Sequence, residues 1–143
     1  MGVTIESKNH AIDMGYGGFR MLRIKVAELT VPDIFEHYKK SMDGMRLYDA
    51  DERKAFYKSY NTKIAELDKK YKGKMSNILD FLYESDCDAE MDADHCRSIY
   101  EVIKDYDDNI LYGYAGRKDC AKFADFKKIV KDGIDSGDGF SWC

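Results

Sequence analysis

Glycines, a tyrosine and two arginines stand directly before and within an expected helix, a combination that suits the binding of an anion. Gly15-Tyr16-Gly17-Gly18 leads the chain to Arg20, and Arg23 follows about one helical turn later. Glycines let backbone N–H groups approach a ligand closely, and the start of a helix carries partial positive charge. Arg20 and Arg23 can each hold a phosphate through paired hydrogen bonds, and Tyr16 can stack on a ring. This segment is a candidate anion site.

A second segment repeats this chemistry later in the chain. Tyr112-Gly113-Tyr114-Ala115-Gly116 leads to Arg117 and Lys118, again just before an expected helix. Tyr112 and Tyr114 are its aromatic candidates, and Arg117 and Lys118 are its cationic ones. We expect Arg117 to contribute most to binding, because its planar guanidinium and the helix dipole would act on the same anion.

Both segments also have a purely structural interpretation. Neither contains the phosphate-loop pattern G-x-x-x-x-G-K-[ST], and neither has G-x-G-x-x-G after a strand. In that interpretation the glycines only end and turn the chain, while the tyrosines pack against the helices. The sequence leaves both interpretations open.

Residues with catalytic potential are few and form no known motif. His10, Asp13 and His37 are the acid–base candidates close to the first glycine segment, but their surroundings match no enzyme family. We therefore assign no catalytic residue. A small hydrolase or transferase acting on a nucleotide is the alternative to a binding protein.

The acidic run 86–94 invites a calcium-loop interpretation that fails on two positions. Oxygen ligands recur at every second residue, yet Met91 stands where the loop needs glycine and Arg97 where it needs glutamate. A solvated loop whose acids complement the dipole of the next helix is favoured. Cys87 and Cys96 lack the paired short spacing of a structural zinc site. We expect no metal and no cofactor.

Charge and hydropathy exclude several partner classes. The net charge of −4 arises from 27 acidic and 23 basic residues that are well mixed, so no basic face for duplex nucleic acid is expected. No apolar stretch approaches the roughly 18 residues of a membrane span, and no export signal is expected. We expect a cytoplasmic protein with reduced thiols at its four cysteines, Cys87, Cys96, Cys120 and Cys143.

Apolar residues at spacings of three and four predict a chain made mostly of amphipathic helices. The expected helices cover 19–29, 31–41, 50–71, 76–83, a segment around 99–106, and 119–132. Val3 to Ser7 and the tail 139–143 are expected strands that pair, whereas 8–14 and 84–94 are expected loops and Asp43-Gly44 a break. The fold class is therefore mainly α (α+β): one domain over 1–143, a compact bundle of five to six helices with a small β element formed by the chain termini.

Three stretches of the sequence carry a resemblance to a group of proteins. The opening 7–19, the later 103–114 and the Trp142 tail resemble small uncharacterised proteins encoded by phages and mobile elements of Gram-positive bacteria. The resemblance implies an antagonist of host defence, which binds a host protein or sequesters a small nucleotide signal. It assigns no functional residue.

The expected function is that of a non-enzymatic binding protein for an anionic nucleotide or for a host protein. Eleven tyrosines exceed what a small helical core needs, and tyrosine is enriched at protein interfaces. We therefore also expect a homodimer.

Overall fold

A four-stranded antiparallel sheet joins the two ends of the chain. The computed structural model describes residues 2–73, 75–106, 110–112 and 121–143. The strand order is β2 (Ala11–Met14), β1 (Val3–Ser7), β6 (Phe140–Trp142) and β3 (Ala89–Met91). In β1, Ile5 lies opposite Trp142 of β6, which confirms the predicted pairing of the two chain ends. A separate pair, β4 (Leu111–Tyr112) and β5 (Ala121–Lys122), forms a second antiparallel sheet.

The β structure extends beyond the predicted terminal element. Residues 8–14 and 84–94 were expected to be loops, but they contain β2 and β3. In β2, Met14 is buried opposite Val3, and in β3, Met91 is buried opposite Phe140. These strands of four and three residues are too short to give a local alternating pattern, so their pairing comes from the strands beside them.

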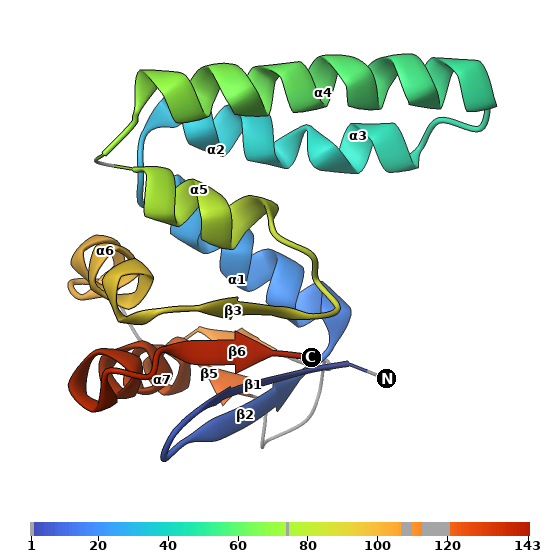
Figure 1. Ribbon diagram of the computed structural model, residues 1–143. Helices are drawn as coiled ribbons and strands as arrows, with labels where there is room; N and C mark the ends of the chain where they lie inside the picture. Colours follow the sequence, from blue (N-terminus) through green and yellow to red (C-terminus); the bar gives the residue numbers. More distant parts are fainter. Residues whose placement is uncertain (1, 74, 107–109, 113–120) are drawn as a thin grey trace.

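The described residues form seven helices, arranged in layers around the sheet (Figure 1). They are α1 (Tyr16–Glu28), α2 (Pro32–Lys39), α3 (Ser41–Met45), α4 (Ala50–Lys70), α5 (Ser76–Tyr83), α6 (Ala93–Ile103) and α7 (Phe123–Ser136). The long α4 lies with α2 and α3 in an outer layer, α1 and α5 lie between this layer and the sheet, and α6 and α7 flank the sheet. Within the described residues, no helix is both long and apolar enough to cross a membrane.

Several helix boundaries differ from the sequence-based expectation. The predicted glycine loop before Phe19 is the N-cap and first turn of α1, and α7 begins at Phe123 instead of at Asp119. Gly44, expected to break the chain, lies inside α3, where a Cβ atom would come within 2.5 Å of the Phe56 ring of α4. Asp49 and Asp92 are the N-caps of α4 and α6, since the side chain of each accepts from backbone N–H in the first turn of its helix.

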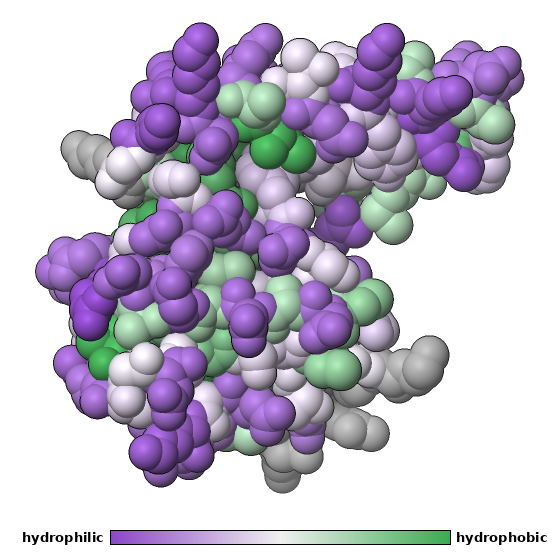
Figure 2. Space-filling view, in the orientation of Figure 1, coloured by the Kyte–Doolittle hydropathy of each residue, from purple (hydrophilic) through white to green (hydrophobic). Residues whose placement is uncertain are grey.

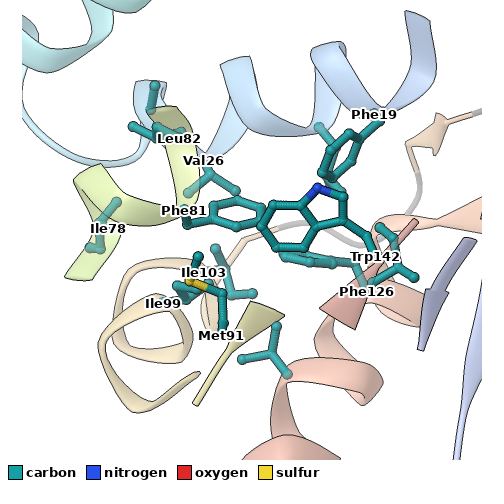
Figure 3. Packing of buried hydrophobic residues seen from close by; sticks show 14 of the residues in the cluster. Phe19, Val26, Ile78, Phe81, Leu82, Met91, Ile99, Ile103, Phe126 and Trp142 are labelled. Atoms are coloured by element: carbon teal, nitrogen blue, oxygen red, sulfur yellow. The ribbon is translucent and has the colours of Figure 1, made fainter. Parts of the chain in front are cut away.

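Aromatic side chains from distant parts of the chain form the centre of the core (Figure 3). The Trp142 ring lies 5.5 Å from that of Phe19 and 5.7 Å from that of Phe81, between centroids. Phe81 also stacks on Phe126 of α7 at 5.6 Å. The indole N–H of Trp142 donates to the carbonyl of Ser85 at 2.8 Å, so the connection after α5 is tied to the core.

Candidate functional site

The start of α1 lines a cavity of about 490 Å3, named here the α1 cavity. Its walls come from α1, α2, α3 and the connection between α5 and β3. The lining residues are Tyr16, Gly17, Phe19, Arg20, Arg23, Tyr38, Met45, Glu84, Ser85 and Asp86. Three residues that the sequence singled out, Tyr16, Arg20 and Arg23, therefore lie together. Figure 2 shows an indentation between the outer α3–α4 layer and the part of the molecule next to it.

Arg23 is the most unusual residue of this cavity, because its side chain is only 5% exposed. The guanidinium carbon lies 4.4 Å from the Phe19 ring centre and 5.1 Å from that of Trp142. One terminal nitrogen donates to the Ser85 carbonyl at 3.3 Å, but Nε has no hydrogen-bond partner among the described residues. A buried unpaired N–H group costs free energy, so Arg23 is held in this cavity wall at a cost to stability.

The charge of Arg23 is supported by its neighbours against the effect of burial. Burial lowers the pKa of the guanidinium, whereas the neighbouring Tyr38 hydroxyl and the charges of Asp86 and Glu84 raise it. Burial likewise raises the pKa of Tyr38, and Arg23 opposes that shift. Arg23 thus remains a cation beside a neutral phenol.

Arg20 is held in place by hydrogen bonds to two residues of α3. Its two terminal nitrogens donate to Ser41 Oγ and to Met45 Sδ, both at 3.0 Å. The helix α3 therefore fixes where the Arg20 guanidinium lies in the α1 cavity.

The first turn of α1 adds backbone donors to the two arginines. Its N-cap, Gly15, has an extended backbone, and in the described structure no side chain caps the turn and no acidic residue lies within it. The first N–H groups of a helix have no partner inside the helix. At Gly17, a Cβ atom would meet nothing within 4 Å, so this turn is open to a ligand.

Acidic side chains line the part of the cavity that the α5–β3 connection forms. Glu84 and Asp86 are both exposed, and the charge of each helps to raise the pKa of Arg23. The cavity is thus bounded by two cations and two carboxylates. These acids, Tyr38 and Met45 were not predicted as site residues, because they come from elements distant from the first glycine segment.

The second predicted segment is described only at its first residue. Tyr112, which we expected to be a ligand-stacking residue, is 4% exposed and packs with its ring centre 6.0 Å from that of Phe123. Burial raises its pKa. Tyr112 is therefore part of the core, and it does not line the α1 cavity. Tyr114, Arg117 and Lys118 lie outside the described residues.

The acid–base candidates do not converge on the α1 cavity. Asp13 accepts a hydrogen bond from Thr4 on the neighbouring strand. His37 is buried, with Nδ1 2.7 Å from the Tyr83 hydroxyl and Nε2 3.1 Å from the Tyr60 carbonyl.

The two histidine candidates, His37 and His10, each line a different cavity. His37 lies at a cavity of about 650 Å3 between α2 and α4, where its ring stacks on that of Tyr60 at 4.1 Å. His10 shares a cavity of about 300 Å3 with Asp132, whose carboxylate accepts from Ser7 Oγ at 2.6 Å and from Asn9. These bonds lower the pKa of Asp132 to about 2, which makes it a weak base.

Metal binding has no support in the described part of the chain, where no group of three or more His, Cys, Asp or Glu side chains could hold an ion.

The chain matches no protein family, and neither a curated protein sequence nor a solved structure matches it.

Proposed function

We propose that this protein binds a small anionic ligand, a nucleotide, in the α1 cavity and acts by holding it. The observation that carries the proposal is that Arg20 and Arg23 line one cavity together with the uncapped first turn of α1. Arginine donors and helix N-terminal N–H groups are the two protein groups best suited to phosphate. Here both line one cavity.

The size and the aromatic lining of the cavity support a nucleotide over a simple ion. A volume of about 490 Å3 lies within the ordinary range of small-molecule sites. Tyr16 is 41% exposed on the cavity wall, which leaves its ring available for stacking on a base.

The biological role that we propose follows from the sequence resemblance. A phage-encoded protein that holds a nucleotide signal of host defence would act in the host cytoplasm by lowering the free concentration of that signal. Binding of a host protein is the other mode of antagonism. An excess of a nucleotide ligand distinguishes the two modes, because it should saturate a protein that sequesters nucleotides and leave the binding of a host protein unchanged.

A thermal-shift screen with nucleoside 5′-monophosphates and inorganic phosphate tests the proposal. A ligand present at about 100 times its dissociation constant stabilises a protein by about 2.7 kcal/mol. Arg20→Gln should weaken the binding of a stabilising nucleotide by about 1.5–3 kcal/mol, the range for hydrogen bonds to charged groups.

Arg46→Gln is the matched control, because Arg46 is an exposed arginine at the end of α3 that does not line the α1 cavity. It should leave the affinity unchanged. The absence of any stabilising nucleotide, or equal losses in the two variants, would contradict the proposal.

A further inference from the structure

We propose, on the basis of the proposed function, that the nucleotide is a guanine nucleotide, with its phosphate at Arg20 and Arg23 and its base at Glu84 and Asp86. The inference follows from the opposite charges that line the α1 cavity, where α3 holds the Arg20 guanidinium and the α5–β3 connection contributes Glu84 and Asp86. A ligand that fills this cavity must bring negative charge to one part and hydrogen-bond donors to another.

The part of the α5–β3 connection that carries Glu84 and Asp86, named here the acidic wall, is attached to the core through Ser85. Ser85, between Glu84 and Asp86, uses its carbonyl to accept from both Arg23 and the Trp142 indole. Glu84 and Asp86 therefore flank an anchored residue, and both line the α1 cavity.

Ionised carboxylates can only accept hydrogen bonds, so they select what approaches them. The Glu84 carboxylate has no hydrogen-bond partner among the described residues, and Asp86 accepts only the weak donor Cys87 Sγ, at 3.3 Å. A second phosphate or an acceptor-rich group would be repelled at this wall. A ligand edge with two adjacent N–H donors matches the two oxygens of one carboxylate.

Guanine is the common base with such an edge. Its N1–H and 2-amino groups are adjacent donors, whereas adenine and cytosine place a ring acceptor beside their amino donor, and uracil places its single N–H between two carbonyl oxygens. A carboxylate therefore pairs with guanine through two hydrogen bonds and with the other bases through one at most. Tyr16 lies on the cavity wall with an exposed ring that can stack on the base.

Titration calorimetry with GMP and IMP provides the sharpest test, since IMP differs from GMP only by the missing 2-amino group. We expect wild-type protein to bind GMP about tenfold more tightly than IMP, the factor that corresponds to about 1.4 kcal/mol. Asp86→Asn and Glu84→Gln replace an acceptor-only group by one of nearly equal size. At least one of them should bring the GMP to IMP affinity ratio close to one.

Asp88→Asn is the control, because Asp88 is an exposed acid of the same connection that does not line the cavity. It should keep the preference for GMP. Equal affinities for GMP and IMP in the wild type, or tighter binding of AMP or UMP, overturn the guanine assignment while leaving the proposed function intact. A gain in affinity for all monophosphates alike in Asp86→Asn and Glu84→Gln overturns it too, because the acids would then only repel phosphate. Binding of no monophosphate at all overturns both proposals.

Discussion

Among single residues, His95 joins two helices, because its ring contacts a carboxylate of each, and the strength of both contacts depends on whether the ring is protonated. Its ring nitrogens lie 2.7 Å from Asp80 of α5 and 2.7 Å from Asp92, the N-cap of α6. Burial lowers the pKa of His95, but the two carboxylates together raise it above its usual value of 6.5. The protonated form is therefore favoured by folding, and its stabilisation is present below about pH 6.5 and lost as the pH rises through the folded-state pKa.

We expect His95→Gln to lower the melting temperature more at about pH 5.5 than at about pH 8.5, since only the lower pH retains the ionic contribution in the wild type. Thermal unfolding followed by circular dichroism measures the difference. His10→Gln, in the exposed turn between β1 and β2, serves as the comparison. Equal losses for His95→Gln at the two pH values would show that the ion pairs add nothing to stability.

The cysteines differ in exposure, which predicts their order of reaction. Cys87 and Cys143 are exposed free thiols, whereas Cys96 is a buried free thiol whose pKa burial raises to about 12. Cys120 lies outside the described residues. With a thiol reagent at about pH 8, Cys87 and Cys143 should react in the native protein and Cys96 only after unfolding, because the thiolate is the reactive form. Titration in denaturant without reductant should find four thiols, and fewer would reveal a disulfide.

At the scale of elements, the turn from α7 into β6 depends on two glycines with left-handed backbones. Gly137 ends α7 with φ 78°, and Gly139 has φ 70°. A Cβ atom at Gly137 would meet no atom within 4 Å, but one at Gly139 would lie 1.9 Å from the carbonyl oxygen of Met91. The second glycine therefore permits β3 to approach the chain at the start of β6.

These two positions form a matched pair of variants. Gly137→Ala should destabilise by about 1 kcal/mol, the cost of a left-handed backbone alone. Gly139→Ala should cost about 3 kcal/mol or more, because a steric clash with the Met91 backbone is added. Urea denaturation gives both values from the shift in midpoint at constant slope. Similar costs for the two variants would mean that the β3 approach is not tight.

At the scale of the whole molecule, large apolar side chains are exposed on and just after α3. Met42 is 39% exposed and Tyr48 is 97% exposed. Because exposed apolar residues favour association, we propose this surface as the contact of the expected homodimer. Light scattering on the Met42→Lys, Tyr48→Asp double variant should give half the mass of the wild type. Leu111→Lys changes an exposed apolar residue of β4 and should leave the mass unchanged. A wild-type mass of one chain at high concentration would contradict the dimer.

The sequence by itself determined most of the helices, though not α3, and part of the site, because these are encoded by residues close together in the chain. Spacings of three and four residues marked the buried faces of α1 and α7 and the partly buried face of α4. Arg20 and Arg23 follow the same helix start within eight residues, so their common cavity could be expected from the 3.6-residue period.

Only the tertiary structure decided which other groups face those arginines. Residues 84–94 look locally like a solvated acidic loop, yet the core contact of Ser85 places Glu84 and Asp86 in the same cavity as Arg23, more than 60 positions away in the chain. Tyr112 has the local signature of a ligand-binding tyrosine, but it is buried against Phe123. Strands as short as β3 and cavity walls made from several elements depend on contacts between distant residues, which carry no periodic signal in the sequence.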